Sequence, residues 1–206
     1  TSTGAKDAGG HGLLIPRLQG TVDSISFPLV TSTRSGQKMR ISKGCPASID
    51  LDEDVAWLFG LYAAEGSASP RGAGSTAWRA FLSLSAAEGQ TADRAVDILK
   101  RRGIAATRIR TGENAQNVTV RSTPLALTLR RLMGHGAHNK TVPDEVLLHK
   151  DPAILTAFLA GYVTGDGTDS EHVVQAVTVS RTLALRLQLL LARLGRLRRI
   201  SRHVGK

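Results

Sequence analysis

Hydrophobic residues recur at helical spacing in three segments of the first two thirds of the chain. One covers 55–63, with Asp52 placed to cap the helix N-terminus, and the others cover 88–102 and 124–133. Between them, residues 70–75 form a hairpin turn, and alternating apolar and polar residues predict strands at 80–85, 105–110 and 117–121. The order helix, strand, strand, helix, strand, strand, helix predicts an α+β fold.

The same pattern begins again near residue 150. Asp151 and Pro152 mark a helix start, and a strand over 173–180 and a helix over 183–194 are predicted to follow. In both copies the first helix ends in an acidic residue and a glycine, as two segments show when aligned: Leu58-Phe-Gly-Leu-Tyr-Ala-Ala-Glu65-Gly66 and Leu159-Ala-Gly-Tyr-Val-Thr-Gly-Asp166-Gly167. This internal repeat predicts two copies of one structural unit.

The repeat divides the chain into three parts. Residues 1–49 are rich in Gly, Ser, Thr and Pro, and we expect an arm or linker there. The first repeat is expected over 50–149 and the second over 150–206. The second repeat is expected to be incomplete, because only about forty residues follow Asp166, whereas roughly seventy follow Glu65 within the first repeat.

Charge narrows the class of partner. The 206 residues carry a net charge of +10, which favours a polyanion, because Lys and Arg release counterions from phosphates. An aromatic content of 4% argues against a platform for stacking single-stranded bases, so duplex nucleic acid is the favoured partner. The single cysteine excludes an internal disulfide and a thiolate zinc site, and no apolar run approaches the length of a membrane span. We expect a cytoplasmic protein.

The repeated acidic residues indicate metal chemistry. A carboxylate at a helix C-terminus faces the negative end of the helix dipole, which is unfavourable without a nearby cation. Small residues such as Gly60 and Gly161 would let the two helices pack backbone to backbone and bring Glu65 and Asp166 together. Two ionised carboxylates at one point favour a divalent cation, and oxygen ligands without a thiol favour Mg²⁺ or Mn²⁺ over zinc.

These residues resemble a known family. The paired helices are similar to the motifs of LAGLIDADG homing endonucleases, in the dodecapeptide form associated with inteins. Three further segments resemble blocks of that family: Phe81-Leu-Ser-Leu-Ser, Leu132-Met-Gly-His-Gly-Ala-His-Asn-Lys140-Thr-Val-Pro143-Asp-Glu-Val and Ala176-Val-Thr-Val-Ser-Arg-Thr-Leu-Ala-Leu. The resemblance covers roughly residues 51–197.

The resemblance implies a fold and an activity. The fold would be two αββαββα repeats related by a pseudo-twofold axis, with saddle-shaped antiparallel sheets in the major groove of DNA. Glu65 and Asp166 would bind catalytic Mg²⁺ or Mn²⁺, with the backbone carbonyls of Ala64 and Gly165, and Lys140 would assist near the scissile phosphate. A monomer would hydrolyse both strands of a long asymmetric DNA site and leave short 3′ overhangs.

Strand side chains would then contact the DNA bases. Alternation along the predicted strands gives eight candidates: Arg79, Ser83, Arg108, Arg110, Thr119, Arg121, Gln175 and Thr178. Two alternatives use the same fold. The short second repeat favours a non-catalytic DNA-binding or regulatory descendant, and a group I intron RNA maturase is the other. Retention of Glu65, Asp166 and Lys140 favours the nuclease, expected here as the endonuclease part of an intein.

Overall fold

The computed structural model describes residues 19–29, 45–170, 173–196 and 201. The first repeat has the predicted order of elements, which are α1 (Glu53–Glu65), β3 (Gly66–Pro70), β4 (Trp78–Ser85), α2 (Gly89–Arg101), β5 (Ala106–Arg110), β6 (Ala115–Val120) and α3 (Thr123–Met133). The prediction of an α+β fold with antiparallel sheets is confirmed. The described helices include none long and apolar enough to cross a bilayer.

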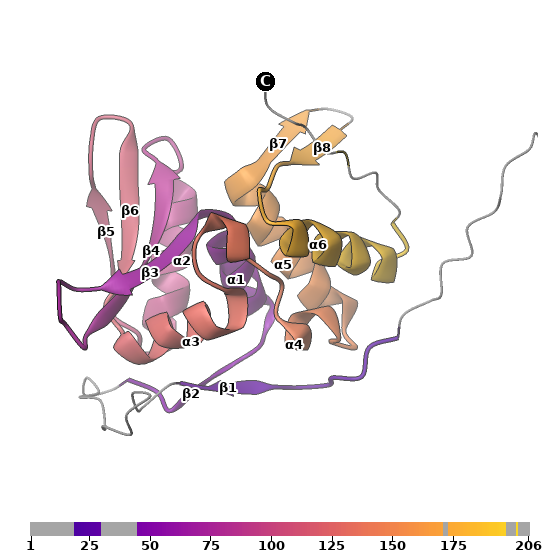
Figure 1. Ribbon diagram of the computed structural model, residues 1–206, viewed down its shortest axis with the longest axis horizontal. Coiled ribbons are helices and arrows are strands. Elements are labelled where there is room, and N and C mark those ends of the chain that lie inside the picture. Colours follow the sequence, from indigo (N-terminus) through magenta and orange to yellow (C-terminus); the bar gives the residue numbers. More distant parts are fainter. Residues whose placement is uncertain (1–18, 30–44, 171–172, 197–200, 202–206) are drawn as a thin grey trace, which may run out of the picture.

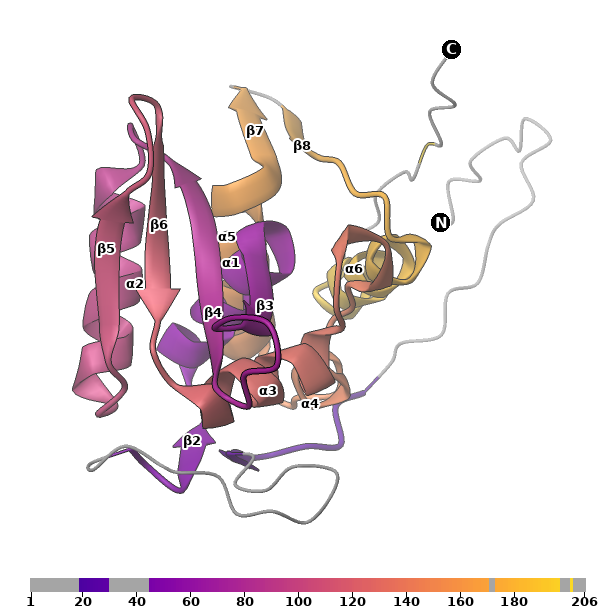
Figure 2. The ribbon, with the colours of Figure 1, turned by 60° about the vertical axis from the view of Figure 1, so that its left-hand side comes forward.

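The strands of the first repeat form one antiparallel sheet in the order β3-β4-β6-β5 (Figure 2). Leu82 lies opposite Val118, and both are buried on the face that α1, α2 and α3 cover. Successive side chains of a strand point to opposite faces, so Ser83 and Thr107 lie on the other face, where both are exposed. We call this second surface the open face.

The second repeat is smaller within the described residues. It follows the short helices η1 (Ala137–Asn139) and α4 (Asp144–Leu147) and contains α5 (Pro152–Asp166), β7 (Gly167–Ser170), β8 (Val173–Ala176) and α6 (Arg181–Arg193). The strand predicted over 173–180 ends at Ala176, and among the described residues it pairs only with β7. Ser180 instead caps α6, because its hydroxyl accepts the Leu183 amide at 3.2 Å.

Helices α1 and α5 lie side by side at the centre of the molecule (Figure 1). A Cβ added to Gly60 would lie 1.9 Å from the Phe158 carbonyl oxygen, and one added to Gly161 would lie 1.9 Å from that of Trp57. Only glycine therefore permits this approach of the two backbones. The contacts advance in the same direction along both helices, so their C-termini lie at the same end.

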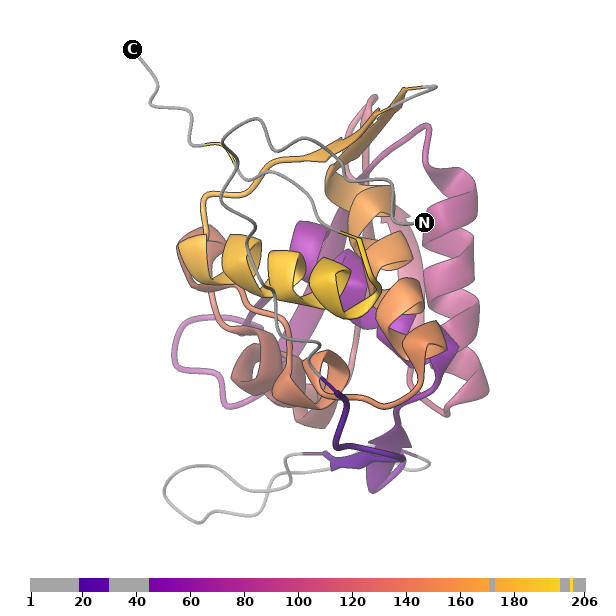
Figure 3. The same cartoon turned by 90° about the vertical axis from the view of Figure 1, so that its right-hand side faces the viewer.

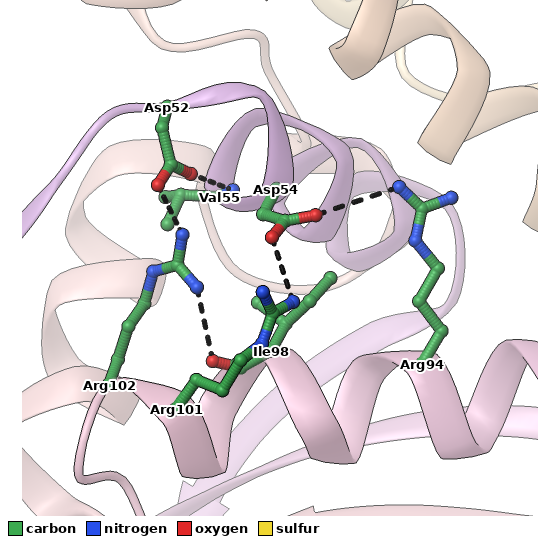
Figure 4. Close-up of polar contacts among 7 residues, drawn as sticks. All are labelled: Asp52, Asp54, Val55, Arg94, Ile98, Arg101 and Arg102. Carbon is green, nitrogen blue, oxygen red and sulfur yellow. Dashed lines mark hydrogen bonds and ion pairs between the residues drawn. The ribbon is translucent and has the colours of Figure 1, made fainter.

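An ion-pair network joins the start of α1 to α2 (Figure 4). The Asp52 carboxylate accepts the Val55 amide at 2.9 Å, as predicted for an N-cap, and also pairs with Arg102. Asp54 accepts a hydrogen bond from Arg101 at 2.8 Å and lies 3.8 Å from Arg94. Each exposed ion pair contributes little stability by itself. Together with the N-cap, however, the ion pairs of Asp52 and Asp54 hold the C-terminal part of α2 against the start of α1.

Part of the N-terminal segment packs on the first repeat. Strand β1 (Ser26–Pro28) pairs with β2 (Ser48–Asp50), and the Phe27 ring lies 5.4 Å from that of Phe59, centroid to centroid. Phe27 is almost fully buried, so this residue belongs to the hydrophobic core that both repeats share.

Candidate functional site

The two acidic residues of the repeat lie at neighbouring helix ends. Glu65 is the last residue of α1 and Asp166 is the last residue of α5. A Cβ added to Gly165 would lie 2.6 Å from the Ala64 Cβ and 2.9 Å from the Glu65 Cγ. The glycine contacts of the helix pair thus bring together the two carboxylates that the sequence singled out.

The neighbourhood of these carboxylates raises their pKa values. Burial, followed by the charges of Asp166 and Glu88, raises the pKa of Glu65 to about 7, while Lys140 opposes the rise. Burial also raises the pKa of Asp166, and a hydrogen bond with Tyr162 opposes that rise. The site is therefore one at which a proton or another cation stabilises the pair.

Lys140 supplies a cation at this end of the helix pair. The side chain is 5% exposed, and its Nζ donates to the carbonyl oxygens of Tyr62 at 2.8 Å and Gly66 at 2.7 Å. The ammonium also lies 3.9 Å from the centroid of the Tyr62 ring. Burial lowers the pKa of Lys140 to about 8, although Asp166 and Glu65 favour its charged form. Lys140 thus caps the C-terminal carbonyls of α1 beside both carboxylates.

Helix α6 holds the loop that carries Lys140. The Ser180 hydroxyl donates to the Lys140 carbonyl at 2.7 Å, and Arg186 donates to the Val142 carbonyl at 2.6 Å. Arg186 also pairs with Asp144 at 2.5 Å. In Figure 3, α6 runs in yellow across the near face of the molecule. Sequence reasoning missed Ser180, although a serine before an apolar helical segment is a recognisable signal for a cap.

The site offers oxygen donors suited to a hard divalent cation. The two carboxylates and the carbonyls of Ala64 and Gly165 belong to the touching helix ends, and within the described residues neither carboxylate takes part in a salt bridge. The described part of the chain holds no group of three or more His, Cys, Asp or Glu side chains arranged for a metal ion. The donor set fits Mg²⁺ or Mn²⁺ if further oxygen ligands come from substrate and water.

The open face carries part of the predicted DNA-binding set. Ser83 is exposed there, and Thr119 lies on the same face opposite Phe81. Arg79 is half-buried with its guanidinium 5.0 Å from the centroid of the Phe81 ring, and Arg121 follows β6 directly. These four candidates share one face of the sheet, where Thr119 is buried, and their contact with DNA stays a prediction.

The structure corrects the face assigned to Arg108 and Arg110. In the register of β5 with β6 they lie opposite Val118 and Gln116, on the face that the helices cover. The Arg108 guanidinium lies 3.1 Å from both carboxylate oxygens of Asp93 in α2. Strand β5 lies at the edge of the sheet, so the long side chains of Arg108 and Arg110 extend beyond the covering helices and reach polar partners there.

The open face of β5 presents other residues instead. Thr107 and Ile109 point there, and Ile109 is 41% exposed. In the second repeat, Gln175 lies in β8, while Thr178 lies beyond the end of that strand. The Thr178 Oγ1 accepts the Ser180 amide at 3.1 Å, so this side chain belongs to the start of α6.

Comparison with known proteins identifies a family and several relatives. Residues 52–134 and 153–206 match the profile of the family described as LAGLIDADG-like domain. The chain is 30% identical, over 93% of its length, to the ATP-dependent DNA helicase Hel308 of Thermococcus kodakarensis. It is 27% identical, over 63% of its length, to the replication factor C small subunit of Methanocaldococcus jannaschii. The chain spans only 18% and 7% of these two relatives.

The fold is similar to solved structures of one homing endonuclease. I-DmoI in complex with DNA and Mn has a TM-score of 0.54 and 13% sequence identity, over 69% of this chain and 78% of that one. I-DmoI in complex with DNA and Ca has a TM-score of 0.51 and the same identity, over 69% and 72%. At this identity the likeness concerns the fold.

Proposed function

Because this chain belongs to the family of LAGLIDADG-like domains, we propose that it is a site-specific endonuclease that hydrolyses both strands of duplex DNA with divalent metal ions. The observation that carries the proposal is the meeting of Glu65 and Asp166 at touching helix ends, beside the buried ammonium of Lys140. A protein that only binds DNA has no need of two neighbouring carboxylates whose like charges repel each other.

We assign roles to the residues of this cluster. Glu65 and Asp166, with the carbonyls of Ala64 and Gly165, would hold Mg²⁺ or Mn²⁺. When bound, such an ion polarises phosphoryl oxygens and lowers the pKa of water. Lys140 keeps a proton on Nζ near neutral pH and stabilises negative charge at the scissile phosphate. The hydrogen bond of Tyr162 favours the ionised form of Asp166.

The proposed substrate is a long asymmetric DNA site, bound by a monomer and cut to leave short 3′ overhangs. The net charge of +10 and the arginines of the open face support a duplex partner. Complexes of the structural neighbour I-DmoI with DNA support the same substrate class. The described sheets of the two repeats differ in size, which favours an asymmetric site, because each repeat would contact one half of it.

We further propose that the chain is the endonuclease part of an intein of the dodecapeptide type. Segments similar to this chain occur in two proteins with different names, a helicase and a replication factor subunit, and make up only a small share of each. A module inserted into unrelated hosts would give this pattern.

The first experiment is cleavage of a plasmid library of candidate insertion sites in Mg²⁺ by the wild type, Glu65→Gln and Asp166→Asn. Glu53→Gln is the matched control, since Glu53 lies at the other end of α1. We expect discrete double-strand breaks with the wild type and the control and none with the two site variants. Cleavage that persists in Asp166→Asn would refute the proposed active site.

A second candidate function is DNA binding without cleavage. The smaller second repeat favours this alternative: among the described residues its sheet has two strands, whereas the sheet of the first repeat has four. Tight, salt-sensitive binding by a wild type that makes no breaks would identify the chain as such a binder.

A further inference from the structure

One end of the open face is hollowed. The hollow has a volume of about 810 Å³ and is lined by residues from the turn between β3 and β4, from the segment before β5, from the end of β6 and from the start of α3. Three arginines line it, Arg71, Arg79 and Arg121. Strand β3 begins beside Glu65 and ends near the hollow, so the arginines lie roughly 15 Å from the carboxylates, at about 3.3 Å per residue.

None of the three arginines has a carboxylate partner in the described part of the chain, although Arg79 lies over the Phe81 ring. Within the described residues, none of them forms a salt bridge, whereas arginines of α2, β5 and α6 do. The Nε of Arg79 is buried and has no hydrogen-bond partner. A buried unpaired donor on a charged group is costly, and the described chain supplies no acceptor for it, so an anion near this guanidinium would lower that cost.

The strand register adds electrostatic repulsion. Ala80 lies opposite Val120 in the β4–β6 pair, so one further step along the register sets Arg79 opposite Arg121. Like charges at directly opposed positions destabilise a sheet. A bound anion between the two guanidinium groups would remove that repulsion, whereas the edge of a neutral base would not.

From these contacts we propose that the hollow binds a backbone phosphate of duplex DNA. Arg71, Arg79 and Arg121 would then hold the duplex at a distance from the cut phosphodiesters and contribute affinity without base specificity. This role differs from the base contacts expected for Arg79 and Arg121 from the sequence alone, and it rests on the proposed function because it requires DNA on the open face.

The test measures duplex affinity against salt concentration, without divalent metal, for Arg71→Ala, Arg79→Ala and Arg121→Ala. We expect each variant to bind a target and a scrambled duplex more weakly by the same factor, roughly 5- to 10-fold, and to lower the salt slope by about 1. Arg101→Ala is the control, since this arginine is 63% exposed and paired with Asp54. Loss confined to the target duplex, or an unchanged slope, would overturn the proposal.

Cys45 provides a second measurement that needs no variant. It is the single cysteine of the chain, is half-buried, and lines the same hollow. Its alkylation by iodoacetamide should slow when duplex DNA saturates the protein. Equal protection by inorganic phosphate at the same phosphate concentration would contradict a site for duplex DNA, and an unchanged rate with bound duplex would exclude the hollow as a contact.

These outcomes are separate from those of the cleavage experiment. If the wild type binds duplex DNA through the three arginines but makes no breaks, the proposed nuclease activity is refuted and the proposed phosphate site is supported. If the wild type cleaves DNA but none of the three variants has a lower salt slope, the nuclease activity is supported and the phosphate site is refuted.

Discussion

Glu65 makes the stability of the metal-free protein fall as the pH rises. Its pKa is raised from its ordinary value of 4.5 to about 7, so the folded state holds the proton more tightly than the unfolded state. Stability from this group is present at low pH and is lost as pH rises from 4.5 to about 7. In urea denaturation, Glu65→Gln should lack this loss, roughly 1 to 3 kcal/mol after allowance for solvent screening.

The comparison between variant and wild type removes the carboxylates that do not interact with Glu65, because these titrate in both proteins. Asp166 and Lys140 respond to the charge of Glu65, so the difference includes their response. A difference between the two proteins that stays constant from acidic to neutral pH would contradict the prediction.

A divalent cation bound at Glu65 should offset this loss of stability at higher pH. Because metal must displace the proton from Glu65, Mg²⁺ should raise the Tm more at about pH 8 than at about pH 5.5. Glu65→Gln should remove most of the rise, and Glu53→Gln should keep it. Equal rises at the two pH values in the wild type would show that the ion binds elsewhere.

The limits of sequence reasoning are clearest for single residues. Glu65 and Asp166 could be paired from the sequence because they repeat in matching contexts. The contact of Lys140 with the Tyr62 carbonyl joins residues 78 positions apart, and no periodic pattern records it. Arg108 was placed on the wrong face because alternation shows which residues share a face but not which face the helices cover.

At the scale of elements, the pairing of α1 with α5 depends on two glycines. Gly60→Ala or Gly161→Ala should destabilise the protein by about 3 kcal/mol or more, because the obstructing atoms are backbone carbonyls that cannot rotate away. Gly112→Ala is the control, since no atom lies within 4 Å of its added Cβ. Chemical denaturation measures all three, and a loss no larger than that of the control would refute the close approach.

Long elements could be predicted where several signals agree. Helices α1, α3 and α5 combine apolar periodicity with an N-cap or an early proline, and each lies where the sequence placed it. The short α4 and η1 were missed, since three or four residues hold too little of a helical period. Strand β8 ends early because Ser180 is needed as the cap of α6.

At the scale of the whole molecule, the described parts of the two repeats differ in size. The described residues of the first repeat form four strands of sheet, and those of the second form two. On the proposed function, hydroxyl-radical footprinting should show protection that extends further on one side of the cut, the side bound by the first repeat. Arg79→Ala should reduce protection on that side alone, and a footprint symmetric about the cut would contradict this assignment.

The glycine contact between α1 and α5 separates two properties of the proposed enzyme. On the proposed function, the side chains of the open face would determine which DNA is bound, and substitutions can change them one at a time. The approach of the two helices that carry the carboxylates is limited by backbone carbonyls at Gly60 and Gly161, which lie apart from the open face. If the proposed function holds, the chain could acquire a new target sequence while the stagger between its two cuts stays the same.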